Sequence, residues 1–298
     1  MNLPEIRRAN PLDISLLITT AALWAGAFVG IKVAVPTLGP IGVATARAVL
    51  GFVVLLPFAL AKGLPLPDSR SQWLLLILMA QLNITVPFFG ISWAELTVDA
   101  GVASLLMGIG PLFAMLGSHV FTSDDKMTAP RVAGVGLGFC GLVVLLGADT
   151  IEAAEHAALP AKMALIGSSL CYVIAGLFVR RIRIAPLAMA VYALGIASVT
   201  LVPLMLLIGA PNWPSSTGVV VAILYLGTFP TGLAYLLRFH LIRTVGYATF
   251  ALSINLIPIF GVLLGVAILG EWPTWQTWVA LALVMTGLLV ARLPRSTR

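Results

Sequence analysis

Hydrophobic residues run along most of this chain in long continuous stretches, and the charged residues collect in short clusters between them. Each stretch is about as long as the roughly 20 residues that a helix needs to cross the hydrocarbon core of a bilayer. A membrane β-barrel would instead show short segments of alternating polarity. We therefore predict transmembrane helices at approximately 12–34, 40–61, 71–92, 98–121, 130–147, 161–180, 186–209, 217–237, 246–269 and 274–291.

Composition supports an all-α integral membrane protein with ten transmembrane helices. The chain is 60% hydrophobic and 9% charged, with a mean hydropathy of +1.07, whereas about a quarter of the residues of a soluble domain are charged. The first stretch follows Arg7 and Arg8. It is too long for the apolar core of a signal peptide and meets no small-residue cleavage site before Lys32, so we expect a retained helix.

No arrangement of side chains indicates an enzyme, a metal site or a cofactor. The two cysteines, Cys140 and Cys171, fall within predicted helices and lack the spacing of metal ligands. The three histidines are scattered, and no carboxylates cluster with them. We therefore expect no catalytic residue, no metal and no cofactor.

The distribution of positive charge predicts the orientation in the membrane. With a cytoplasmic N-terminus, fourteen of the 17 Lys and Arg residues fall on the inner side, and only Lys32, Arg47 and Lys162 lie toward the outer side. This bias is the one that bacterial inner-membrane proteins show. It predicts a multi-pass protein of the bacterial inner (plasma) membrane with both termini in the cytoplasm. It also accounts for the net charge of +6 without nucleic acid as a partner.

The second half of the sequence repeats the first at a shift of 146 to 148 positions. Matched pairs include Gly39-Pro40 with Ala185-Pro186, Pro111 with Pro258, and Asp124 with Glu271. Because each half holds five predicted helices, an odd number, the second half must cross the membrane in the opposite sense. We predict a first repeat at 1–148, an external linker at 149–159 and an inverted second repeat at 160–298.

The paired prolines Pro111 and Pro258 fall inside apolar stretches, where each removes one helical hydrogen bond. In transporters built from inverted repeats, interrupted helices border the substrate site. A simple packing kink is the alternative for either residue. We interpret the pair as hinges.

Four motifs resemble one family of membrane proteins. They are "LWAGAFVGIK" at 23–32, "ATAR" at 44–47, "PLFAMLGSHVFTSDD" at 111–125 and "PIFGVLLGVAILGE" at 258–271. The chain is similar over nearly its whole length to the drug/metabolite transporter superfamily, and within it to the EamA group. It departs at Asp124-Asp125, where the family usually has Glu. The resemblance implies export of small metabolites, often amino acids, through a central cavity lined by helices 1, 3, 4, 6, 8 and 9.

Helical periodicity then selects side chains that face this expected cavity. Polar and aromatic residues recur on one face of the eighth helix, and equivalent positions of the third helix lie 147 positions earlier. Ordinary interhelical packing is the alternative. The predicted substrate-binding residues are Trp24, Phe28, Leu78, Gln81, Thr85, Phe88, Ser104, Gly108, Tyr172, Tyr225, Thr228, Tyr235 and Asn255.

Charged residues inside spans are costly and point to function. Arg47 lies at a depth similar to that of Glu95 and Asp99, so these three residues are predicted to form an external gate. Lys32 lies nearby, where snorkelling to the headgroups would explain it.

The midplane of the predicted helices holds no Asp or Glu, which disfavours proton-coupled efflux of polycationic drugs. We predict a secondary transporter for small neutral or zwitterionic metabolites, working by alternating access and facilitated diffusion; amino acids are implied by the family resemblance. The alternatives are a sugar-phosphate or nucleotide-sugar exchanger, a non-transporting receptor, or a membrane enzyme. The expected partners are a small-molecule substrate and the lipid bilayer, and a monomer is compatible with the sequence.

Overall fold

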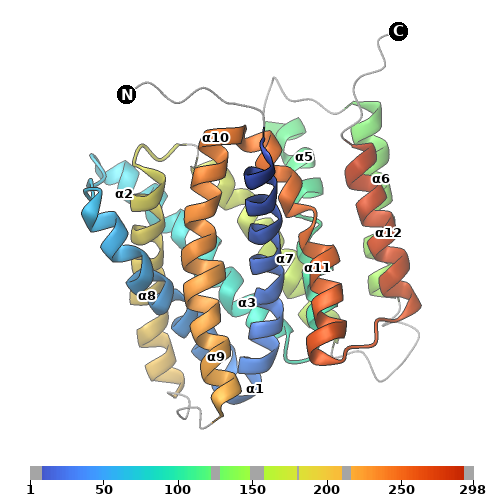
Figure 1. The fold of residues 1–298 in the computed structure, drawn as a ribbon, viewed down its shortest axis with the longest axis horizontal. Coiled ribbons are helices and arrows are strands. Elements are labelled where there is room, and N and C mark those ends of the chain that lie inside the picture. Colours follow the sequence, from blue (N-terminus) through green and yellow to red (C-terminus); the bar gives the residue numbers. More distant parts are fainter. Residues whose placement is uncertain (1–8, 122–127, 148–157, 180, 210–215, 292–298) are drawn as a thin grey trace.

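The computed structural model describes residues 9–121, 128–147, 158–179, 181–209 and 216–291, and within them every regular element is a helix (Figure 1). This confirms the predicted all-helical class for the described residues. Residues 149–157 of the predicted linker lie outside them, as do Asp124 and Asp125. Six helices are long and apolar enough to cross a membrane: Pro11–Ala61, Arg70–Ala94, Ala129–Leu146, Leu159–Gly176, Pro186–Ile208 and Thr217–Arg238.

Three further apolar helices are shorter, at Ala100–Phe113, Ile257–Leu269 and Trp275–Val290. The predicted count of ten crossings therefore stays a prediction. The elements are α1 (Pro11–Ala61), α2 (Arg70–Ala80), η1 (Gln81–Thr85), α3 (Val86–Ala94), α4 (Ala100–Met107), α5 (Gly110–Phe121), α6 (Ala129–Gly147), α7 (Ala158–Val179), α8 (Pro186–Ile208), α9 (Thr217–Leu226), η4 (Gly227–Leu233), α10 (Ala234–Ile254), α11 (Ile257–Leu264), η5 (Gly265–Leu269) and α12 (Trp275–Val290).

Element α1 consists of two helices that meet at Gly39. This glycine has φ 66° and ψ 167°, a conformation that residues with a Cβ rarely adopt. Pro40 follows directly and can begin the second helix because the first N–H groups of a helix need no partner within it. The predicted stretches 12–34 and 40–61 are thus joined by helical residues and divided by a single turn residue.

Helical residues run from Thr217 to Ile254, across the predicted break at 238–245, which contains neither Gly nor Pro to end a helix. The apolar span Thr217–Arg238 nevertheless matches the predicted stretch 217–237. A break in the helix falls later, at Asn255 and Leu256. Figure 1 shows the chain turning back at the upper edge of the molecule within α10, before α11 begins lower down.

Wide π-helical turns interrupt two equivalent helices. Element η1 lies between α2 and α3, and η4 lies between α9 and α10. Shifting η1 by 147 positions places it within η4. A π-turn adds one residue to the helical path, so side chains on its two sides are rotated relative to one another.

Helix α1 occupies the centre of the fold and packs against α3, α4, α8, α9, α10 and α11. Small residues allow the closest approaches elsewhere. Helices α6 and α12 lie side by side (Figure 1), because Gly134 and Gly287 each face the backbone oxygen of the other. Such glycine contacts are typical of helix pairs in membranes, where close packing supplies the attraction.

We expect Gly134→Ala to destabilise the protein by about 1–3 kcal/mol, because the new Cβ would overlap the Gly287 oxygen and the Ala291 side chain. The matched control is Gly136→Ala on the same helix, where a Cβ meets no atom within 4 Å. Thermal unfolding in detergent measures both variants. Equal melting temperatures for the two variants would contradict this description of the α6–α12 contact.

Candidate functional site

Two helices are broken near the middle of the molecule, at positions 147 residues apart. Helix α4 ends before Gly108 and α5 begins at Gly110, while α10 ends before Asn255 and α11 begins at Ile257. Pro111 and Pro258 are the second residues of α5 and α11, where a missing N–H costs no helical bond. The prolines therefore start new helices, and their predicted hinge role stays a prediction.

Helices α4 and α11 cross in close contact on one side of these breaks. A Cβ built at Gly108 would strike Pro258, and one built at Gly261 would strike Ser104. The Ser104 hydroxyl also donates to the Gly101 carbonyl at 2.8 Å. The structure thus places the predicted site residues Ser104 and Gly108 in a packed helix crossing.

Glu271, which follows η5, forms hydrogen bonds that hold the start of α4 at this crossing. Its two carboxylate oxygens accept hydrogen bonds from the backbone N–H groups of Ala100, at 2.7 Å, and Gly101, at 3.0 Å. Both donors belong to the first turn of α4, where unpaired N–H groups and the helix dipole favour a negative charge. We call this end of the molecule, defined by Lys32, Asp99, the first turn of α4 and Glu271, the clamped end.

Lys32 makes a second set of contacts at the clamped end. Its ammonium donates to the backbone carbonyls of Glu95, at 3.0 Å, and Val98, at 2.8 Å, and lies 3.9 Å from the Asp99 carboxylate. Lys32 therefore stabilises the carboxyl end of α3 rather than only reaching toward headgroups. The predicted gate residue Asp99 meets Lys32 and forms no ion pair with Arg47.

Glu95 is fully buried, and neither of its carboxyl oxygens has a hydrogen-bond partner. The residue directly follows the apolar span Arg70–Ala94. Burial raises the pKa of the Glu95 carboxyl well above its usual range, and the neighbouring Lys32 ammonium opposes this effect. Removal from water favours the uncharged form of this carboxyl.

Arg47 lies in the second half of α1 and is only 8% exposed. Its Nε donates to Thr231 Oγ1 at 3.0 Å, and its guanidinium carbon lies 3.9 Å from the ring centroid of Phe88. A cation over an aromatic face is attracted by the electrons of the ring. These two contacts fix the orientation of the guanidinium, and Phe88 is one of the predicted substrate-binding residues.

The π-turn η4 explains why Thr231 is available to Arg47. Pro230 has no N–H to donate to the Leu226 carbonyl four residues earlier. The Thr231 hydroxyl donates to that carbonyl at 2.8 Å and so is oriented to accept from Arg47. The Trp24 indole donates to the Pro230 carbonyl at 3.0 Å, which gives this mid-span tryptophan a structural partner.

Three predicted tyrosines gather around Arg47. The side chains of Tyr172, Tyr225 and Tyr235 all lie within electrostatic range of its guanidinium, as does Glu95. The Tyr225 hydroxyl donates to the Leu23 carbonyl at 3.0 Å, and the Tyr235 hydroxyl accepts from the Asn83 amide at 3.1 Å. The structure thus brings Phe88 and the three tyrosines together, and it adds Arg47, which the sequence placed in a gate.

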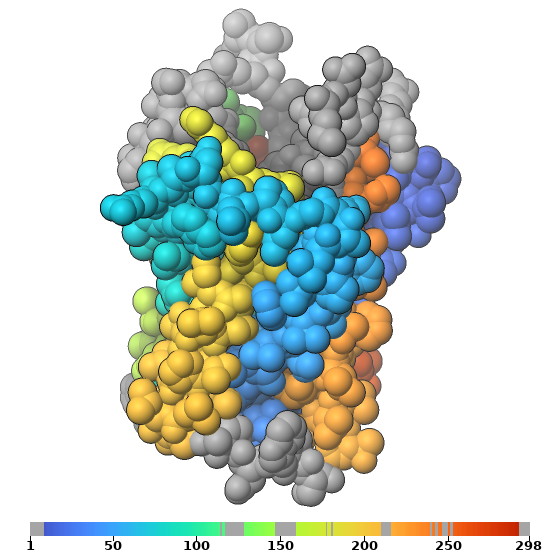
Figure 2. All heavy atoms as spheres, turned by 90° about the vertical axis from the view of Figure 1, so that its left-hand side faces the viewer, coloured from blue at the N-terminus to red at the C-terminus, as the bar shows by residue number. Residues whose placement is uncertain are grey.

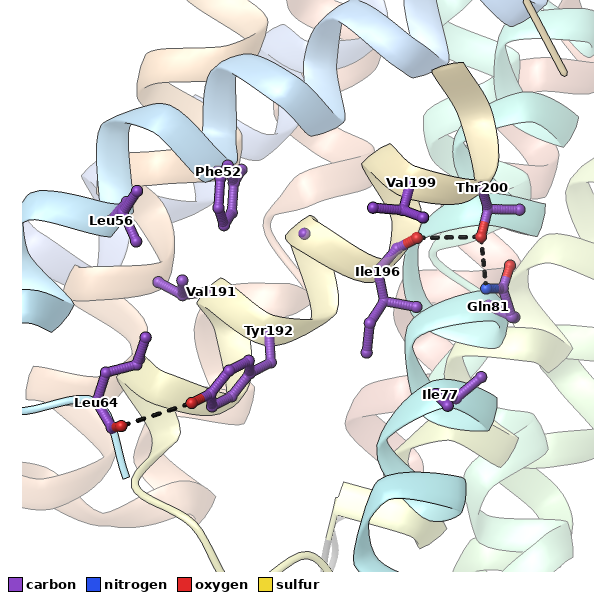
Figure 3. A pocket seen from close by; sticks show the side chains of 11 residues that line it. Phe52, Leu56, Leu64, Ile77, Gln81, Val191, Tyr192, Ile196, Val199 and Thr200 are labelled. Carbon is purple, nitrogen blue, oxygen red and sulfur yellow. Dashed lines mark hydrogen bonds between the residues drawn. The ribbon is translucent and has the colours of Figure 1, made fainter. Parts of the chain in front are cut away.

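Leu78 and Gln81, the first two residues of the predicted face on the third helix, lie away from the Arg47 site. Gln81 donates to Thr200 of α8 at 3.0 Å and lines an apolar pocket of about 500 Å³ between α1, α2 and α8 (Figure 3). Figure 2 shows these segments side by side on one face of the molecule. Leu78 is 41% exposed. Because η1 rotates the residues before it relative to those after it, Leu78 and Gln81 do not share a face with Phe88.

The remaining predicted residues occupy varied surroundings. Phe28 is buried in the apolar core, and Thr228 is half-buried within η4. Thr85 and Asn255 are buried, and each has an oxygen without a partner. Asn255 lies at the helix break, as expected for a residue that could face a solute.

Sequence reasoning missed Asn83, Thr231 and Glu271 as functional candidates. Asn83 carries a recognisable signal, since a buried amide within a span needs a partner. Thr231 follows a mid-span proline, which also predicts a local hydroxyl partner. Glu271 acts across 170 residues, and no local pattern marks such a contact.

This arrangement defines a class of protein: a helical membrane protein whose broken helices and aromatic, polar interior site resemble those of solute transporters. The model of the EamA-like transporter family matches residues 12–147 and again residues 159–293. The chain therefore belongs to the EamA-like transporter family.

Named relatives agree with this family. The chain is 25% identical over 290 residues to a probable terminal-alkyne amino-acid exporter of Streptantibioticus cattleyicolor, covering 92% of this chain and 91% of that protein. It is 26% identical over 294 residues to the uncharacterized inner membrane transporter YedA of Escherichia coli K12, covering 97% and 93%. A solved crystal structure shares the fold with a TM-score of 0.68 and 22% identity, over 95% of this chain and 98% of the other.

We expect Thr231→Val to cost about 1–3 kcal/mol of stability, because the Leu226 carbonyl loses a hydroxyl donor and Arg47 Nε loses its acceptor. Thr231→Ser keeps the hydroxyl and is the matched control, with an expected cost within about 1 kcal/mol for the lost methyl group. Thermal unfolding in detergent compares the two. A serine variant as unstable as the valine variant would show that the hydroxyl is unimportant.

The buried Glu95 carboxyl should make the stability of the folded protein depend on pH. The unfolded chain ionises Glu95 at the ordinary pKa of glutamate, whereas the folded protein keeps it protonated to higher pH. The contribution of neutral Glu95 is therefore complete at low pH and is lost as pH rises toward the raised pKa. Glu95→Gln should gain melting temperature relative to wild type as pH increases. A pH-independent difference between Glu95→Gln and wild type would contradict the assignment.

Proposed function

We propose that this protein is a secondary transporter that exports small neutral or zwitterionic metabolites, amino acids foremost, by alternating access. It crosses the membrane ten times, as two inverted five-helix repeats at 1–148 and 160–298. Both termini are cytoplasmic in the plasma membrane of a bacterium. In this orientation the clamped end, which Glu271 and Lys32 hold together, faces the outside.

The observation that carries the proposal is the convergence of Phe88, Tyr172, Tyr225 and Tyr235 around Arg47. These side chains come from α3, α7, α9 and α10, and Arg47 comes from α1. A site that combines aromatic rings with a few fixed polar groups suits a small solute with an apolar part and a polar part. Because the five elements belong to both proposed repeats, a rocking of one repeat against the other would open the site to alternate sides.

The relatives support a metabolite substrate. One of them is named as a probable amino-acid exporter, and an amino acid has the size and mixed polarity that the aromatic site suits. A sugar-phosphate or nucleotide-sugar exchanger would need several basic groups at the site. Among the described residues, the groups around Arg47 are aromatic, hydroxyl and carboxyl groups, so this alternative has less support.

Facilitated diffusion is the proposed transport mode. Among the described residues, Glu95 is the acidic side chain within electrostatic range of Arg47, and it is buried without a partner. The predicted helices hold no Asp or Glu near their midplane, where a proton-coupled exporter would be expected to offer one. The flux should therefore follow the solute gradient.

The proposal predicts saturable counterflow of labelled phenylalanine, leucine or serine into proteoliposomes loaded with the unlabelled amino acid. Tyr172→Ala should weaken this flux roughly tenfold, since losing one aromatic contact costs about 1.4 kcal/mol. Tyr192→Ala is the matched control, because Tyr192 lines the pocket of Figure 3 and not the Arg47 site. Absence of saturable flux from folded protein would overturn the amino-acid proposal. An imposed proton gradient that drives uptake would overturn facilitated diffusion.

A further inference from the structure

Arg47 presents a positive charge that the described residues do not neutralise. An arginine this deeply buried in a span usually faces a partner of opposite charge. No described carboxylate lies within ion-pair distance of it, and Lys32 pairs with Asp99 instead. The acidic group in its range, Glu95, makes no hydrogen bond or ion pair with it. The tyrosine hydroxyls are uncharged, so none of the described groups that contact Arg47 carries a compensating negative charge.

The two terminal nitrogens of Arg47 are also free to donate. The Nε group is engaged by Thr231, whereas neither Nη group has an acceptor among the described residues. Buried polar atoms without a partner are few in this structure, and the Arg47 nitrogens are not among those sealed from solvent. The Nη groups therefore have no hydrogen-bond acceptor among the described residues and keep some contact with solvent-accessible space.

The rest of the guanidinium is held rigidly. Phe88 covers one face of its plane, and Thr231 fixes the edge that carries Nε. Thr231 is itself fixed by its bond to the Leu226 carbonyl. What remains exposed is the edge of a planar fork with two parallel N–H donors, and that geometry matches the two oxygens of a carboxylate.

We propose that Arg47 binds the carboxylate of the transported solute through its two Nη groups, so that the substrates are amphiphilic monocarboxylates, including zwitterionic amino acids. This inference rests on the proposed transport function and narrows its substrate class. A single guanidinium balances one negative charge, so a phosphate monoester with two charges would remain partly uncompensated. The surrounding rings of Tyr172 and Tyr225 would receive the apolar part of the solute.

The test is competition against counterflow of labelled phenylalanine in proteoliposomes. The competitors are 3-phenylpropionate, which keeps the carboxylate, phenethylamine, which keeps only the ammonium group, and glucose 6-phosphate. We expect 3-phenylpropionate to compete and the other two to fail. Competition by phenethylamine equal to that of 3-phenylpropionate would overturn the carboxylate site while leaving the transporter proposal intact. Competition by glucose 6-phosphate alone would identify a phosphate site instead.

Variants of Arg47 test the residue itself. Arg47→Gln should weaken 3-phenylpropionate competition roughly 10- to 100-fold. Arg47→Lys keeps the positive charge but loses the two parallel N–H donors of the guanidinium. Its competition by 3-phenylpropionate should therefore lie between that of wild type and that of Arg47→Gln. Arg183→Gln, which removes an exposed arginine outside the site, is the matched control and should leave competition unchanged. Equal competition in Arg47→Gln and wild type would overturn the assignment.

A chemical readout is independent of transport. Phenylglyoxal modifies arginines whose terminal nitrogens are open, so mass spectrometry should find Arg47 modified in the purified protein. Addition of 3-phenylpropionate should protect it, and phenethylamine should not. Protection without any amino-acid flux would sustain the carboxylate site and refute amino-acid transport. An Arg47 that remains unmodified, or that is protected equally by both compounds, would refute the site.

Discussion

The missing N–H of Pro230 determines how the centre of this molecule is built. In a water-free interior every backbone carbonyl needs a donor, and Pro230 cannot supply one to Leu226. The π-turn η4 lets a donor one residue further on reach this carbonyl, and the Thr231 hydroxyl, which bonds it, presents a lone pair to Arg47. The Trp24 indole bonds the Pro230 carbonyl of the same turn. One backbone constraint therefore joins both halves of α1 to η4 and leaves the guanidinium fixed beside Phe88.

Much of the fold follows from local sequence rules. The predicted stretches 12–34 and 40–61 leave Gly39 between them, where the structure turns, and the paired prolines found from the repeat lie at the starts of helices. The helical stretches follow from apolar length. The predicted stretch 217–237 matches the apolar span Thr217–Arg238, and the charged segment after it is helical because it contains no residue that ends a helix.

The site was only partly predictable, because its composition depends on helical phase and on distant contacts. A pattern counted at 3.6 residues per turn groups Leu78 and Gln81 with Phe88, but the π-turn η1 between them changes the phase. Arg47 was assigned to the gate by depth along the membrane, yet its contacts are Thr231 and Phe88. Depth alone does not say to which side of its helix a long side chain extends.

The clamped end must be able to open during transport, whereas the Arg47 site must keep a buried charge balanced. The clamp holds α4 against the segment after α11 through two charge-assisted bonds, and such bonds contribute about 1.5–3 kcal/mol each when shielded. In the proposed cycle these bonds must break for the solute to leave, so they cannot be much stronger than the water contacts that replace them. Their position near the surface meets this condition, because water can solvate both Glu271 and the α4 terminus as they part. Arg47 lies deeper, and its charge is best balanced by a bound carboxylate. The solute would then stabilise the packed interior while the clamp sets how readily the end opens.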